Sequence, residues 1–162
     1  MRTRNLVTVI AAIVALLALM PLGAQVRPGD AEDETALDVI SEHEQTTVAY
    51  QLFGEEFADA LDGGQRLALF VPADDVFAQI DREREEVSEE EIRALYERHV
   101  ATGLASQEPI EWIEWFATVD GQRITVTVQE DGTVLLNDTV SIIEAIPTQN
   151  GIVYIIDGSL GM

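Results

Sequence analysis

The chain has only two histidines, His43 and His99, as candidates for proton transfer or metal binding near neutral pH. His43 lies between Glu42 and Glu44 and is expected to face solvent. His99 falls on an apolar helix face, so we expect a buried, hydrogen-bonded structural residue, with a ligand or base as the alternative. Two separated histidines without any Cys cannot supply a convincing zinc site. We therefore expect no metal and no cofactor.

Carboxylates are abundant, because the 162 residues include 30 Asp and Glu against 9 basic residues. With so many acids, some pairs come within catalytic distance by accident, and no Ser-His-Asp order stands out. The acidic run 83–91 lacks the alternating ligands and central glycine of an EF-hand loop, so a solvated helix start is expected there. The chain is therefore not expected to be an enzyme, and a hydrolase built on acids is the remaining catalytic alternative.

The segment 111–116 holds the main concentration of aromatic side chains. Trp112 and Trp115 are three residues apart, so in a helical turn they would share a face, with Phe116 beside them. They are expected either to cover one end of the fold or to form an exposed patch that docks a sugar ring, an apolar ligand or a partner. Asp157, at the end of the last predicted strand, is expected to accept backbone hydrogen bonds, with a contact surface as the alternative.

The elements that must position these side chains follow from the hydrophobic pattern. Three- and four-residue spacing predicts two helices within 35–61, with Thr46 and Thr47 offering a break and an N-cap between them. The continuous apolar run 67–71 predicts a buried strand, which Pro72 ends. Acidic residues then favour the start of another helix.

The second half of the chain changes from helical to strand periodicity. A capping box over 88–91 opens a helix that carries His99 and that Gly103 is expected to close. Beyond residue 109, alternating segments joined by tight turns at 131–132 and 150–151 predict a run of strands. This order predicts an α+β domain with the early strand inserted into a largely antiparallel sheet system.

The N-terminal segment is expected to direct export. Residues 1–24 combine a basic start, a long apolar stretch and small residues, which is typical of a secretory signal. An uncleaved anchor using residues 5–24 is the alternative. Residues 25–34 are expected to form an acidic linker, and residues 35–160 a single domain. Both alternatives predict a secreted, periplasmic or cell-surface protein.

The net charge of −21 excludes whole classes of partner. Neither nucleic acid nor an anionic membrane surface is favoured, because the chain cannot neutralise their phosphates. All nine basic residues are Arg and none is Lys, a composition that we interpret as adaptation to a saline exterior. There, salt screens the repulsion between the acids.

Two segments carry the most specific pattern, LFVPADDVF (69–77) and NGIVYIID (150–157). The first is typical of a strand-to-helix junction, and the second of a buried strand entered through an Asn-Gly turn. Together with the His-Val pair between them, they resemble the two end motifs and the central Tyr-His motif of the fasciclin family. The positions that carry this resemblance are Phe70, Pro72, Asp74, Phe77, His99, Asn150 and Gly151.

The resemblance implies a compact wedge of two β-sheets flanked by N-terminal helices, in a domain associated with cell adhesion or matrix contact. We therefore expect a binding module that contacts an extracellular protein, matrix or polysaccharide component without catalysis. Nucleic acid is not expected as a partner, and a membrane is expected only through residues 5–24. The alternative is a carrier that holds a small apolar ligand in a groove lined by Trp112, Trp115 and Phe116.

The sequence also departs from the family pattern. Ala73 replaces the Thr that usually caps the first-motif helix, a role that Asp74 could take over. Arg98 replaces the Tyr before the histidine, and Ala145 replaces the acid before Ile146. In animal relatives that Asp-Ile pair is discussed as an integrin contact, so the loss puts the mechanism in doubt here. Taken together, the motifs and the aromatic segment give five candidate binding residues: Ile146, Asp157, Trp112, Trp115 and Phe116.

Overall fold

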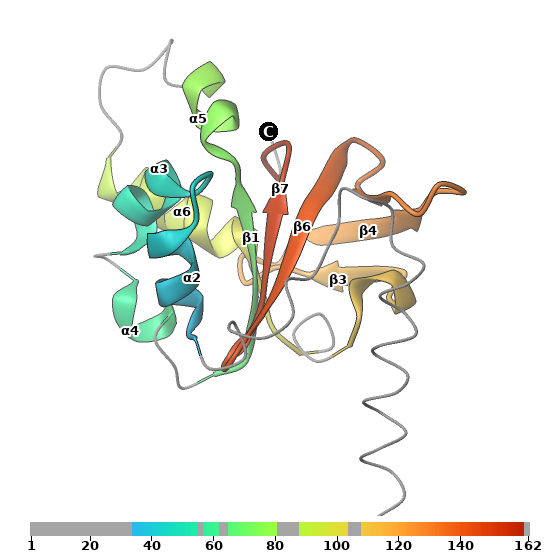
Figure 1. Ribbon diagram of the computed structural model, residues 1–162, viewed down its shortest axis with the longest axis horizontal. Coiled ribbons are helices and arrows are strands. Elements are labelled where there is room, and N and C mark those ends of the chain that lie inside the picture. The colour runs from blue at the N-terminus through green and yellow to red at the C-terminus, as the bar shows by residue number, and fades with distance from the viewer. Residues whose placement is uncertain (1–33, 55–56, 62–64, 81–87, 104–107, 161–162) are drawn as a thin grey trace, which may run out of the picture.

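The computed structural model describes residues 34–54, 57–61, 65–80, 88–103 and 108–160, and Figure 1 shows how they are arranged. The expected signal or anchor (1–24) and nearly all of the expected linker (25–34) lie outside these residues. The helical elements are α2 (Ala36–Glu42), α3 (Thr47–Ala49), the π-helical turn η2 (Tyr50–Gly54), α4 (Ala58–Leu61), α5 (Asp74–Ile80), α6 (Glu89–His99) and the 3₁₀ turn η5 (Ile110–Trp112). The strands are β1 (Leu67–Pro72), β2 (Val100–Ala101), β3 (Trp115–Ala117), β4 (Arg123–Val128), β5 (Val134–Leu136), β6 (Val140–Thr148) and β7 (Gly151–Ile156).

All these strands belong to one hydrogen-bonded sheet, in the order β2-β1-β7-β6-β5-β4-β3. Its two edges approach each other through a bridge between Ala101 and Thr118 and a hydrogen bond from the Val119 N–H to the Val100 carbonyl (2.8 Å). The sheet is thus a near-barrel, which corrects the expectation of two separate sheets. The reason is β6, which pairs with β5 at its start and with β7 along the rest of its length, and so joins the two halves.

The early strand lies inside the sheet, as predicted. β1 pairs in parallel with β7 and antiparallel with β2, while the other neighbouring strands are all antiparallel. The helices α2 to α6 lie together on one side of β1 in Figure 1. Because the core of the near-barrel lies on the opposite face of β1, this strand is buried along its whole length.

Alternate residues of β1 serve two different cores. Leu69 and Val71 pack toward the helices, with Val153 and Ile155 of β7. Phe70 packs into the near-barrel on the opposite face of the strand. The near-barrel core also contains Ile110, Phe116, Ile124, Leu136, Tyr154 and Leu160.

The turn before β7 ties the helices to the sheet. The Asn150 side chain accepts a hydrogen bond from the Ala36 N–H (3.0 Å) and donates one to the Leu61 carbonyl (2.8 Å). Gly151 has φ +146°, and an added Cβ would lie 1.8 Å from the Leu67 carbonyl oxygen. Only glycine fits at this position. Asn150 and Gly151 therefore hold the start of α2, the end of α4 and the start of β1 in place.

Asp74 stands at the start of α5, as predicted, and has a further role that the sequence did not indicate. Its carboxylate accepts hydrogen bonds from the Thr47 N–H (3.2 Å) and the Val48 N–H (2.9 Å), so it caps the start of α3. Thr46 occupies the N-cap position of α3, but its buried hydroxyl donates to the carbonyls of Ile40 (2.8 Å) and His43 (3.1 Å). The side chain that caps α3 is thus Asp74, at the beginning of α5, and not the threonine that the local sequence suggested.

The helix that carries His99 begins as predicted and ends early. Ser88 and Glu91 form a reciprocal capping box at its start. α6 ends at His99, because Val100 has extended backbone angles and pairs with Leu69 of β1. Gly103 was expected to close this helix, but it lies beyond β2.

Candidate functional site

An open groove of about 970 Å³ lies beside η5 and β3. Its lining combines apolar and acidic side chains, including those of Glu108, Trp112, Glu114, Trp115, Phe116 and Val119. The volume falls within the range of small-molecule pockets, about 300 to 1,000 Å³. The groove is open to solvent, so it can receive a segment of a larger partner as well as a small ligand.

The tryptophans of the aromatic segment are exposed. Trp112 is 65% exposed and Trp115 47% exposed, in contrast to Phe116 at 4%. Trp112 ends the turn η5 and Trp115 begins β3, so the condition for a shared helical face, that both lie in one helical turn, is not met. The spacing suggested a helical face because three-residue intervals fit a helix, whereas the hydrogen bonds of β3 with β4 impose strand geometry here.

Phe116 is part of the near-barrel core, although it also lines the groove. Its ring stacks on Phe70 with centroids 4.9 Å apart, and Phe70 stacks in turn on Tyr154 at 5.1 Å. The burial of Phe116 follows from strand alternation, because Phe116 and Trp115 point to opposite faces of β3. The stack gives the groove a well-packed support.

The groove is acidic among its described lining residues. Glu108 and Glu114 are both exposed, and no basic side chain is part of the lining. The guanidinium of Arg123 lies over the Trp115 ring, 4.2 Å from its centroid. This contact orients Trp115 and leaves nearly half of its surface exposed.

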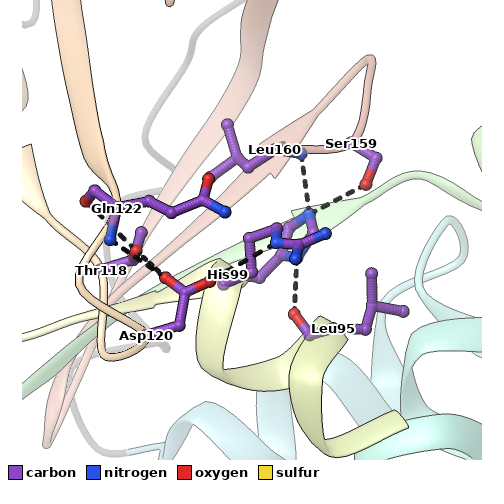
Figure 2. Close-up of polar contacts among 8 residues, drawn as sticks. Leu95, His99, Thr118, Asp120, Gln122, Ser159 and Leu160 are labelled. Carbon is purple, nitrogen blue, oxygen red and sulfur yellow. Dashed lines mark hydrogen bonds and ion pairs between the residues drawn. The ribbon is translucent and has the colours of Figure 1, made fainter. Parts of the chain in front are cut away.

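His99 forms a second polar cluster, drawn in Figure 2, and it is fully buried as predicted. Its Nδ1 lies 2.7 Å from the Leu95 carbonyl oxygen and donates to it, while Nε2 accepts from the Leu160 N–H at 3.0 Å. The Ser159 hydroxyl lies 3.4 Å from the same Nε2. Burial is the main cause that lowers the pKa of His99 to about 4. With its acceptor nitrogen already engaged and no access to solvent, this imidazole connects α6 to the end of the chain.

Arg98, which replaces the usual tyrosine, pairs with Asp120 at 3.5 Å. Asp120 also accepts hydrogen bonds from the Thr118 hydroxyl and the Gln122 N–H. Burial alone would raise the pKa of Asp120, but these hydrogen bonds and the arginine outweigh it and hold the pKa below its ordinary value. This cluster holds the turn after β3 against α6, and sequence reasoning did not identify it because its partners lie 22 residues apart.

Asp157 accepts a hydrogen bond from the Ser141 N–H (2.7 Å) and its own N–H donates to the Ser141 carbonyl (3.1 Å), as the favoured interpretation predicted. Ile146 is buried in the core beneath the helices, so it is not exposed as an expected contact residue should be. His43 was expected to face solvent. Its side chain is instead only 13% exposed, and its Nε2 contacts Glu144 at 3.1 Å.

The groove residues that sequence reasoning missed include Glu108, Glu114 and Val119. Val119 is 52% exposed, and three of the five exposed large hydrophobic side chains in the described part of the chain line this groove. Local sequence offered no signal for this gathering, because it depends on how η5, β3 and the following turn fold together. Within the described ranges, no group of three or more potential ligands is placed to hold a metal, and no helix is long and apolar enough to cross a membrane.

Comparisons with known proteins identify the fold and the family. The family model of the fasciclin domain matches residues 44–162, most of the chain. Among solved structures, a FAS1 domain pair from the insect cell adhesion molecule Fasciclin I is similar at 17% identity, with a TM-score of 0.65. The alignment covers 81% of this chain and 52% of the domain pair, so this chain spans about half of that structure. No curated protein sequence matches. The chain belongs to the fasciclin domain family.

Proposed function

We propose that this chain is an extracytoplasmic adhesion or binding module that contacts a protein or glycan partner through the groove beside β3, without catalysis. Fasciclin domains are generally adhesion modules that act through protein interactions and are typically extracellular or at the cell surface. The observation that carries the choice of surface is the gathering of Trp112, Trp115 and Val119 around one groove. Exposed apolar patches of this kind mark contact sites.

The family-motif positions support this choice by their location. Phe70, Asn150 and Gly151 are buried, and each contributes to packing, hydrogen bonding or backbone geometry inside the fold. Asp157 is exposed, but its carboxylate bonds a strand amide. These positions therefore have structural roles, and the lining of the groove lies outside them.

A panel of extracellular-matrix proteins and a glycan array, probed with the wild-type chain, test the proposal. We expect at least one protein or glycan to bind the wild-type chain, and this binding to be lost in the Trp112→Ala and Trp115→Ala variants. An Ala substitution of Val128, which is 47% exposed and does not line the groove, serves as the control. Binding that survives both tryptophan substitutions would show that another face makes the contact.

The proposed location has its own test. We infer export from residues 1–24, whether that segment is cleaved or retained as an anchor. A C-terminally tagged chain in its own host should be found outside the cytoplasm. Recovery only from the cytoplasm would contradict both forms of the proposal.

A carrier of a small apolar ligand is the second candidate, and the groove volume of about 970 Å³ is the observation that favours it. Native mass spectrometry of protein purified from its own host separates the two. A carrier should arrive with a bound small molecule that Trp112→Ala releases, whereas an adhesion module should have the mass of the chain alone.

A further inference from the structure

We propose that the groove beside β3 takes an arginine-bearing segment of a partner protein, held by Glu108 and Glu114 and stacked on Trp112. The inference rests on the proposed function, because it assumes that this groove is the contact face. It adds the chemical class of the ligand, a guanidinium on an extended peptide.

The charge of the groove favours a cationic ligand. Glu108 and Glu114 are both exposed, and no cation of the described residues pairs with either. The described residues of the lining include no basic side chain. A cationic ligand can therefore bind both carboxylates without displacing a partner from either. The net charge of −21 adds a long-range field that attracts cations.

The two indole rings of the groove differ in what lies over them. Trp115 already carries the Arg123 guanidinium at 4.2 Å, the geometry of a cation–π contact. Trp112, at 65% exposure, has no cation over its ring within the described part of the chain. A guanidinium on a partner can stack on Trp112 in the same way, and its fork of donors matches a carboxylate.

Other occupants fit these features less well. A second copy of the chain would bring another −21 charges to an acidic groove. A neutral sugar can stack on Trp112, but it leaves both glutamates without a counter-charge. An apolar ligand would bury those carboxylates or leave them unused at the rim.

The chain reports on its own groove, because Trp112 and Trp115 are its only tryptophans. Tryptophan fluorescence of the full chain is titrated with three probes: a short capped peptide of alternating arginine and glycine, the same peptide with citrulline for arginine, and a neutral glucose oligosaccharide. Citrulline keeps the shape of arginine and removes its charge. We expect saturable binding of the arginine peptide, about tenfold weaker binding of the citrulline peptide, and loss of affinity with added salt.

The matched variants separate the groove charge from the net charge. In Glu108→Gln/Glu114→Gln, arginine-peptide affinity should fall by about two- to thirtyfold. The control Glu42→Gln/Glu130→Gln makes the same charge change at two exposed glutamates outside the groove lining, and its affinity should stay close to wild type. Near-UV circular dichroism confirms that both variants are folded.

Several outcomes would overturn the inference. One is that no probe changes the fluorescence; another is that both double variants bind the arginine peptide equally well. A third is that the citrulline peptide or the oligosaccharide binds as strongly as the arginine peptide. In the third case, if Trp112→Ala abolishes that binding, the groove remains the contact face and only the ligand class is wrong. If the arginine peptide binds and Trp112→Ala has no effect, both the inference and the choice of this groove fail.

Discussion

The helix side of β1 and the groove beside β3 differ in how they place their polar and aromatic side chains. On the helix side, polar groups far apart in sequence are paired across elements, as Asn150 does with α2 and α4 and Asp74 does with α3. In the described part of the chain, no buried side-chain nitrogen or oxygen lacks a hydrogen-bond partner. In the groove, by contrast, two tryptophans and two glutamates are exposed to solvent. The family-motif positions therefore build the fold, while the contact surface that we propose lies outside them.

The largest effect should come from the helix side. We expect Gly151→Ala to destabilise the domain by at least about 4 kcal/mol, because its Cβ would overlap the Leu67 carbonyl. Gly121→Ala is the matched control, with φ +86° and nothing within 4 Å of the added Cβ, and should cost about 1 to 2 kcal/mol. Urea unfolding measures both. Equal losses would show that only backbone angle matters at Gly151.

The segment 111–116 contains both a buried and an exposed aromatic side chain, so the two can be compared within a few residues. We expect Phe116→Ala to cost about 3 to 5 kcal/mol, because it removes a ring stacked on Phe70. Trp112→Ala should change stability by less than about 0.5 kcal/mol, since that side chain is 65% exposed. The free energy of unfolding of each variant, measured by chemical denaturation, tests both expectations. A large loss in Trp112→Ala would mean that the groove contributes to the fold after all.

Acid should weaken the helix side through His99. Its pKa is 6.5 in the unfolded chain and about 4 when folded, so the unfolded state binds more protons between these values. Stability should therefore be complete above pH 6.5 and fall by about 3 kcal/mol as the pH drops to 4. The measurement is the free energy of unfolding against pH. His99→Gln cannot protonate in this range and should show a flatter profile; identical profiles would contradict the buried neutral imidazole.

Salt should have the smallest effect on stability. It should stabilise the folded domain but weaken binding in the groove. Because the chain carries −21, we expect molar salt to stabilise the domain by about 1 kcal/mol, or about 4 °C in the thermal midpoint. The same salt should weaken arginine-peptide binding in the groove. A thermal midpoint that stays constant between low and molar salt would refute the interpretation as a protein adapted to a saline exterior.

The sequence alone was sufficient where the signal is local or motif-based. The apolar run of β1, the capping box at Ser88 and the Asn150-Gly151 turn each depend on residues close together in the chain, so their types predicted their structure. The buried state of His99 followed from helical periodicity. The resemblance to the fasciclin family added the overall order of these elements.

Only the tertiary structure decided the pairings between distant segments. The closure of the sheet at Ala101 and Thr118, the capping of α3 by Asp74 and the ion pair of Arg98 with Asp120 join residues that local patterns cannot relate. The place of Trp115 is likewise set by β3 pairing with β4, which imposes strand geometry where the three-residue spacing suggested a helical face. The physical reason is that local preference fixes which elements can form, whereas burial and hydrogen bonding across the whole domain select how they meet.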